Sequence, residues 1–189
     1  MAELFDEFPY LISDTVIVKQ MEVSDVEALS EISHNDNVYK YIPAFLYKKS
    51  NKFLETAIKN LGGRDFNKKK LIIAGIYLKS NPDRLIGLAE MFDYKKRENR
   101  ITVGYRLNES YWNQGIATKT LKLMKEYLVD KIGIAKLQAF VIPENIYSSK
   151  VLLNNGFVKE DYMVQEKDWG GQEVVMVNVY TFITDDKKV

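Results

Sequence analysis

The sequence predicts a mixed α/β fold in one layered system, and three features indicate it. Short apolar or β-branched runs, bounded by turn residues, are typical of strands. Longer segments carry apolar residues at helical spacing. The two kinds of segment alternate in the second half of the chain, as they do when helices pack on a sheet. The chain has 189 residues, 46% of them hydrophobic, so we expect a single domain over residues 1–189.

The amino-terminal half is predicted to hold one strand and three helical segments. Residues 15–19 (TVIVK) alternate and are β-branched, as in a strand. Ser24 and Glu27 have the spacing of a capping box, so a helix should begin at Ser24. A helical turn over residues 38–42 follows. A helix over residues 50–61 should be stopped by the two glycines that come after it.

The second half is predicted to hold six strands and two helices. The predicted strands are residues 71–78, 85–92, 100–107, 136–141, 158–165 and 173–183. The predicted helices are residues 115–129 and 144–155. A Trp-Gly-Gly turn separates the last two strands, which we therefore expect to form an antiparallel hairpin.

Composition excludes several classes of function. Lys plus Arg is 27 and Asp plus Glu is 26, giving a formal net charge of +1, which disfavours a nucleic-acid-binding protein. The chain has no cysteine, so it has neither a disulfide nor a thiol nucleophile. His34 is the only histidine, and we expect no metal site. The first ten residues lack the pattern of a signal peptide, and no apolar segment approaches the roughly 20 residues of a membrane span. We therefore expect a cytoplasmic protein that does not bind membranes.

A loop followed by a helix offers a candidate anion site. Gly115 opens an amphipathic helix after a predicted strand and a short loop. Free backbone N–H groups at a helix start bind anions, and the small residues Gly115 and Ala117 would let a pyrophosphate approach closely. An ordinary connection with a tight glycine is an equally open interpretation. The chain lacks GxxxxGK[ST], and no GxGxxG follows the first strand, so neither a P-loop nor a Rossmann site is supported.

A second segment, residues 145–157, has the features of a capped helix. Asn145 can cap its start, and Gly156 can end it in the left-handed conformation that glycine tolerates. Phe157 would pack as the chain re-enters the sheet. These features leave Ser148 unexplained.

Taken in order, these motifs resemble one enzyme family. The chain offers Leu85-Ile86-Gly87, Val103-Gly104-Tyr105, Tyr111-Trp112, Gly115-Ile116-Ala117-Thr118, Asn145 with Ser148, Leu152 and Gly156-Phe157. The set resembles the GNAT superfamily of N-acetyltransferases, and more narrowly its RimJ/RimL-like branch, which acetylates protein N-termini or small-molecule amines. The resemblance implies the GNAT fold, a central, mostly antiparallel twisted sheet of six to seven strands flanked by helices on both faces.

The resemblance implies acetyl-CoA as the cofactor, with no metal. The helix start would give N–H groups to the pyrophosphate, a strand would pair with the pantetheine arm, and Asn145 would contact that arm near the thioester. The residues implied for cofactor binding are Val103, Gly104, Tyr105, Gln114, Gly115, Ile116, Ala117, Thr118 and Asn145.

The resemblance also implies direct attack of an amine on the thioester. Ser148 would protonate the leaving thiolate, with Tyr147 as the neighbouring alternative. Glu90 stands among apolar residues on a predicted inner strand and is the first candidate for the base that takes the amine proton. A solvent-facing Glu90 stays open as the alternative, and Glu109 and Glu144 are further candidates.

Two positions depart from the family pattern. Thr102 stands where a glutamate is frequent, and Lys119 replaces a frequent glutamate after the Ala-Thr pair. Both departures leave the identity of the base open.

The resemblance implies that the acceptor is a protein N-terminus or a small-molecule amine. The aromatic cluster Tyr39, Tyr41, Phe45 and Tyr47 would line the acceptor cleft or serve as plain core and surface residues. Trp169 would shape the cleft or a dimer contact, or lie exposed in its turn. Dimers occur in this family, so a homodimer stays open. The alternative function is a non-catalytic acyl-CoA-binding regulatory module with the same fold.

Overall fold

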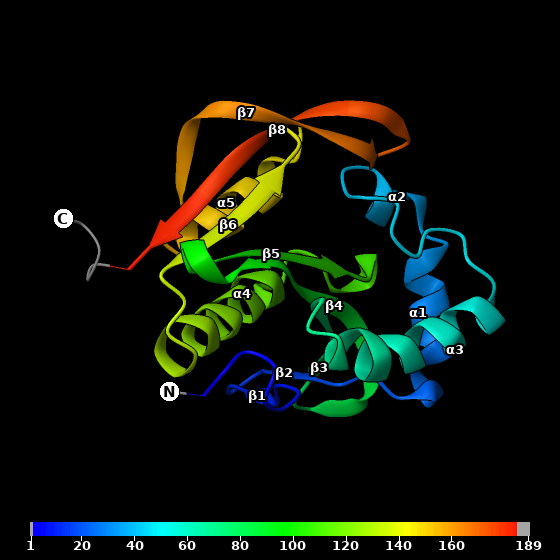
Figure 1. Cartoon of the computed structure of the whole chain (residues 1–189). Helices are drawn as coiled ribbons and strands as arrows, with labels where there is room; N and C mark the ends of the chain where they lie inside the picture. The colour runs from blue at the N-terminus through cyan, green and yellow to red at the C-terminus, as the bar shows by residue number, and fades with distance from the viewer. Residues whose placement is uncertain (1, 185–189) are drawn as a thin grey trace.

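The computed structural model describes residues 2–184, which form one eight-stranded sheet with helices on both faces (Figure 1). The strands are β1 (Leu11–Ile12), β2 (Val16–Lys19), β3 (Leu71–Leu78), β4 (Asn81–Lys95), β5 (Arg100–Leu107), β6 (Lys136–Val141), β7 (Val158–Trp169) and β8 (Gln172–Ile183). Their order is β1-β2-β3-β4-β5-β6-β8-β7, and every neighbouring pair is antiparallel except β5 and β6. The mostly antiparallel sheet is therefore confirmed. The strand count is larger than predicted because β1 has only two residues, too few to show an alternating pattern.

Five helices accompany the sheet. They are α1 (Val26–Ser33), α2 (Asp36–Tyr39), α3 (Asn51–Asn60), α4 (Ile116–Glu126) and α5 (Ile146–Asn154). Short 3₁₀ turns cover Val23–Asp25, Lys96–Glu98 and Glu109–Tyr111, and π-helical turns at Leu61–Asp65 and Tyr127–Lys131 extend α3 and α4. Across residues 2–184, no helix combines the length and the apolar character that a bilayer crossing requires.

Alternation along the strands builds a separate core on each face of the sheet. On β3, Ile72 and Ile76 pack into the core under α4 and α5, whereas Ile73 and Tyr77 pack into the core under α1 and α3. Successive side chains of a strand point to opposite faces, so an apolar run such as β3 feeds both cores. The prediction of helices on both faces is confirmed.

The predicted capping box at Ser24 and Glu27 is wrong. The capping pair lies two residues earlier, at Glu22 and Asp25, and the backbone N–H of Glu22 donates to Asp25 Oδ2 at 2.8 Å. The 3₁₀ turn Val23–Asp25 then leads into α1, so Ser24 lies inside the turn and not at its start.

The two ends of α3 differ in how well the sequence predicted them. The Ser50 cap is confirmed, because its hydroxyl accepts the N–H of Phe53 at 3.3 Å. The predicted stop at Gly62 and Gly63 is wrong, since the π-helical turn passes through both. Neither glycine has a positive φ, so neither breaks the helix as a left-handed residue would.

The parallel pair β5–β6 separates after three residue pairs. Its register runs from Arg100↔Lys136 to Thr102↔Gln138. Beyond Thr102, β5 continues beside β4 as far as Leu107, and β6 continues beside β8 as far as Val141. The sheet therefore has an opening between β5 and β6, beyond Thr102 and Gln138.

A buried hydrogen bond ties β3 to the start of α1, and we expect Tyr77→Phe to weaken the fold. The hydroxyl of buried Tyr77 donates to Asp25 Oδ2 at 2.6 Å. Removing it leaves a buried carboxylate with one donor fewer, which should lower the free energy of unfolding by about 1–3 kcal/mol. Urea denaturation measures the change. Tyr10→Phe, at a side chain 64% exposed, is the matched control and should change it by less than about 0.5 kcal/mol. Equal stabilities for the two variants would contradict the role of this bond.

Candidate active site

A cavity of about 70 Å³ occupies the place where β5 and β6 separate. On the face covered by α4 and α5 its lining includes Val103, Tyr105, Leu121, Ala139, Val141, Asn145, Ser148 and Leu152. Further lining comes from the other side, with Glu90, Phe92, Thr102, Gly104, Arg106, Phe140, Tyr41, Ile42, Pro43 and Trp169. Because strand side chains alternate between faces, this lining shows that the cavity passes through the sheet.

The start of α4 presents free backbone N–H groups. Gly115 is the residue before the helix, with a left-handed backbone (φ 73°). No side chain of the described residues caps α4, whereas Ser50 caps α3 and Asn145 caps α5. A Cβ at Gly115 would meet no atom within 4 Å, so its surroundings are open. An uncapped helix start with open space before it favours an anion.

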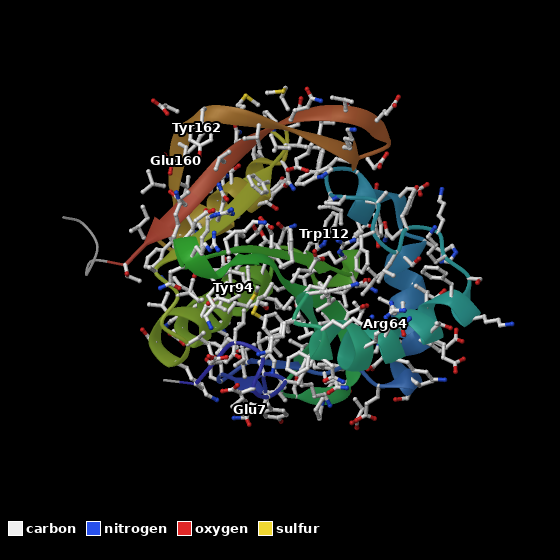
Figure 2. All side chains as sticks on the ribbon, in the orientation of Figure 1. Glu7, Arg64, Tyr94, Trp112, Glu160 and Tyr162 are labelled. Atoms are coloured by element: carbon white, nitrogen blue, oxygen red, sulfur yellow. The ribbon has the colours of Figure 1, made fainter. Side chains whose placement is uncertain are left out.

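Two side chains of the loop that leads to α4 hold it in place by hydrogen bonds to the backbone. Trp112, labelled in Figure 2, is 38% exposed, and its indole N–H donates to the carbonyl of Leu107 at 3.0 Å. The Gln114 side chain likewise donates to the carbonyl of Ser110 at 3.0 Å. Gln114 and Gly115 are exposed, Ile116 is buried, and Ala117 and Thr118 are partly buried. These contacts fix the loop so that the helix start stays open.

Two hydroxyl groups, those of Tyr105 and Ser148, meet at the start of α5, where Asn145 holds Ser148 in place. The hydroxyl of Tyr105 on β5 donates to Ser148 Oγ at 3.3 Å. Asn145 Oδ1 accepts the backbone N–H of Ser148 at 3.2 Å, which holds that residue in the first turn. Burial raises the pKa of Tyr105 to about 12, although the Ser148 hydrogen bond opposes it. Tyr105 therefore stays protonated at neutral pH and leaves the Ser148 proton free for donation. Tyr147, the alternative hydroxyl, is 66% exposed.

Glu90 lies inside the molecule, on the wall of the cavity. Its side chain is buried, so the solvent-facing alternative is wrong. Arg106, on the adjacent strand β5, donates from Nε to Glu90 Oε1 at 2.5 Å. A Cβ at Gly104 would stand 3.6 Å from Glu90 Oε2, so the absence of a side chain there leaves this oxygen uncovered.

Arg106 is fully enclosed and connects Glu90 to the loop after α2. Its Nη1 donates to the carbonyl of Phe45 at 2.9 Å, and its guanidinium lies 5.2 Å from the ring centre of Tyr39. Burial opposes the charge of Arg106, but Glu90 and Tyr39 together outweigh it and raise the pKa of the guanidinium. Arg106 therefore stays charged and keeps Glu90 paired.

The other two carboxylates considered from sequence lie elsewhere. Glu109 accepts hydrogen bonds from the side chains of Asn35 and Asn37 at 2.9 Å each, and these bonds lower its pKa. Glu144 is exposed. Neither is among the residues that line the cavity.

Sequence reasoning missed several residues of the site. Arg106 could have been found from the β4–β5 hairpin, because Glu90 pairs with Gly104 and the side chain two residues along β5 points to the same face. The exposed-turn interpretation of Trp169 is wrong, since it is only 8% exposed and packs against Ile142 and Val177. Thr102 Oγ1 is buried on the cavity wall with no partner among the described residues.

Comparison with known proteins shows a family match and many similar folds. The family model described as "Acetyltransferase (GNAT) domain" matches residues 15–158. An uncharacterized N-acetyltransferase of Bacillus subtilis, YoaA, is 27% identical over 179 residues, covering 93% of this chain and 97% of the relative.

Two solved structures illustrate the shared fold. RimL, a ribosomal L7/L12 alpha-N-protein acetyltransferase in complex with coenzyme A, has a TM-score of 0.78 at 20% identity, covering 92% of this chain and 97% of its own. The microcin C7 self-immunity acetyltransferase MccE, in complex with acetyl-CoA and AMP, has a TM-score of 0.78 at 19% identity, covering 91% and 94%.

We expect Arg106→Met to destabilise the protein, because it leaves the Glu90 carboxylate buried without its partner. The free energy of unfolding should fall by about 3–5 kcal/mol. The double variant Glu90→Leu with Arg106→Met should recover much of that loss, since it removes both charges. Urea denaturation gives the values.

Arg64→Met is the control for this prediction. Arg64 pairs with Asp65 at 3.1 Å, but its side chain is 56% exposed, so its loss should cost less than about 1 kcal/mol. An Arg106→Met protein as stable as the control would show that the buried pair does not support the fold.

Proposed function

Because this chain belongs to the acetyltransferase (GNAT) domain family and is an N-acetyltransferase, we propose that it transfers the acetyl group of acetyl-CoA directly to a primary amine. The observation that carries this proposal is the opening between β5 and β6. The cavity there has two halves. The cofactor half lies on the side of α4 and α5, and the acceptor half lies on the other side of the sheet and holds Glu90. An amine and a thioester entering from opposite faces of the sheet would meet in the cavity.

The residues present fit coenzyme A. The uncapped start of α4, with Gln114, Gly115, Ile116, Ala117 and Thr118, would hold the pyrophosphate through backbone N–H groups. The edge of β5 at Val103, Gly104 and Tyr105 has lost its β6 partner, so it can pair with the amides of the pantetheine arm as with an added strand. Solved relatives of this fold carry acetyl-CoA or coenzyme A, which supports the assignment.

Asn145 completes the cofactor half. Its Oδ1 is committed to the Ser148 N–H, and it lines the cavity. We assign it the contact with the cofactor arm near the thioester. When bound, acetyl-CoA supplies an acetyl group activated as a thioester.

The chain's own groups then perform two proton movements. Glu90 takes the proton that the amine loses, and the hydrogen bond from Arg106 fixes this carboxylate in position. Ser148 gives its proton to the leaving sulfur, and the Tyr105 hydroxyl, which donates to Ser148 Oγ, steadies the serine oxygen as it does so. A backbone N–H of the central strands polarises the carbonyl that is attacked.

The acceptor is a protein N-terminus or a small-molecule amine. The names of RimL and of a putative ribosomal-protein-serine acetyltransferase from Vibrio cholerae, which shares the fold with a TM-score of 0.77, favour the first. The narrowness of the cavity favours the second. The competing function, a non-catalytic acyl-CoA-binding module, predicts cofactor binding with no turnover.

Binding of coenzyme A should depend on the open space at Gly115. Gly115→Trp places an indole before the free N–H groups of α4, and we expect the Kd for acetyl-CoA to rise at least tenfold in isothermal titration calorimetry. The control is Gly171→Trp, because Gly171 has a matching positive φ (74° against 73°) and equally open surroundings but lies in the β7–β8 turn. A Gly115→Trp protein that binds as the wild type does would refute the α4 assignment.

Catalysis should depend on Glu90 and Ser148 while cofactor binding does not. Glu90→Gln keeps an oxygen for Arg106 but cannot take a proton, and Ser148→Ala cannot donate one. We expect each to lower kcat about 10²-fold or more, followed as thiol release over a panel of amines, with the Kd for acetyl-CoA changed less than threefold.

Glu109→Gln, at a carboxylate outside the cavity, is the control and should leave kcat within threefold of the wild type. Wild-type protein that binds acetyl-CoA yet acetylates no amine would favour the non-catalytic module. Full activity of Glu90→Gln would remove Glu90 as the base.

A further inference from the structure

Two distant segments join across the acceptor side of the cavity, and we call residues 42–44 and 168–170 the strap. The N–H of Ala44 donates to the carbonyl of Asp168 at 2.9 Å, and the N–H of Gly170 donates to the carbonyl of Ile42 at 3.1 Å. Between these bonds, Pro43 and Trp169 form an isolated antiparallel bridge. Figure 1 shows the tip of the β7–β8 hairpin reaching the loop that follows α2.

The strap separates the cavity from a larger depression outside it. Ile42, Pro43 and Trp169 line the cavity that holds Glu90. Ile42 also lines the outer depression, of about 510 Å³, together with Gly170 and other residues of the hairpin tip. A peptide lying in the outer depression could not place its amino terminus at Glu90 by that route without breaking the two backbone hydrogen bonds of the strap.

The space inside the strap is small and mostly apolar. The whole cavity, with its cofactor half included, measures about 70 Å³, so the part inside the strap is smaller still. Aromatic rings line the acceptor side, namely Tyr41, Phe92, Phe140 and Trp169. The carboxylate there is Glu90, and Arg106 fixes its orientation. These walls suit an amino group on a compact hydrocarbon skeleton.

We infer that the acceptor is a small primary amine with a compact apolar skeleton and not the amino terminus of a protein. This inference rests on the proposed acetyl transfer and specifies its substrate class. The amine nitrogen bonds to the acetyl carbon and the carbon–sulfur bond breaks. Glu90 receives the proton from nitrogen, and sulfur receives the Ser148 proton. The products are an N-substituted acetamide and the free thiol of coenzyme A.

The first arm of the test compares acceptors on the wild-type protein of 189 residues. Isobutylamine and benzylamine represent small amines, and lysine-free octapeptides that begin with serine or alanine represent protein N-termini. Thiol release gives kcat/KM for each. We expect the better small amine to exceed both peptides at least tenfold. Peptides that match or exceed the small amines would overturn the inference and leave the acetyl transfer standing. No turnover with any acceptor would overturn both.

The second arm opens the strap with a single methyl group. A Cβ at Gly170 would stand 2.3 Å from the carbonyl oxygen of Lys40, so Gly170→Ala must push the hairpin tip and the loop apart. We expect the small-amine to peptide ratio of kcat/KM to fall at least fivefold. The backbone amides of residues 44 and 170 should exchange hydrogen at least tenfold faster in the variant than in the wild type. At position 170 the comparison is between the glycine amide of the wild type and the alanine amide of the variant.

Gly171→Ala is the matched control. Gly171 also has a positive φ (74°, against 55° at Gly170), so both variants carry backbone strain, but a Cβ there would meet no atom within 4 Å. Gly171→Ala should therefore keep both the ratio and the slow exchange. A Gly170→Ala protein whose strap amides exchange faster while the ratio stays at the wild-type value would overturn the strap as the determinant of acceptor size.

Discussion

The parting of β5 from β6 is the constraint on which the rest of the site depends. A strand inside a sheet normally satisfies its backbone groups on both edges, and an unpaired buried edge costs free energy comparable to lost hydrogen bonds. Here β5 keeps β4 along its length but loses β6 after Thr102. The open edge at Val103–Tyr105 leaves backbone groups that can pair with water or, as we propose, with the amides of the pantetheine arm. The same parting brings residues from both faces to one cavity.

The buried pair Glu90–Arg106 shows how a charge can stay inside this core. An isolated carboxylate at such a position would be strongly disfavoured. Arg106 offsets that cost by a direct bond to Glu90 and a second bond to the Phe45 carbonyl, while the rings of Tyr39 and Phe45 lie within 5.6 Å of its guanidinium. The arrangement leaves one carboxylate oxygen beside Gly104, where no side chain covers it. The pair therefore holds the proposed base in place and leaves the space beside Gly104 free.

Local pattern predicted most of the fold, including the strands and helix caps around the cavity. Strand alternation, the Ser50 cap and the Asn145 cap depend on neighbours a few residues away, and the structure has them. The errors arose where a local signal had a competitor. Glu22 and Asp25 replaced Ser24 and Glu27 as the capping pair, and Gly62 and Gly63 were absorbed into a π-helical turn.

The sequence pointed to Glu90, Tyr41 and Trp169, which line the cavity, but not to the contacts that assemble the acceptor half, because these join residues far apart in the chain. Arg106 meets Phe45 across 61 positions, and the strap joins residues 42–44 to 168–170. The periodicity of one segment carries no information on contacts with a distant segment. Trp169 lies in a Gly-rich turn, and only its contact with the loop at Pro43 shows that it is buried.

Membership of the family describes the start of α4 and the edge of β5 better than it describes the acceptor side. The start of α4 and the edge of β5 are set by short motifs that a family model can match, and residues 15–158 match it. The hairpin tip at 168–170 lies beyond that match, and it closes one side of the acceptor half. The family match therefore carries no information on the strap, which we infer sets the size of the amine admitted. For that reason the acceptor of this chain is better inferred from its own strap, its cavity and its Glu90–Arg106 pair than from the named substrates of proteins that share its fold.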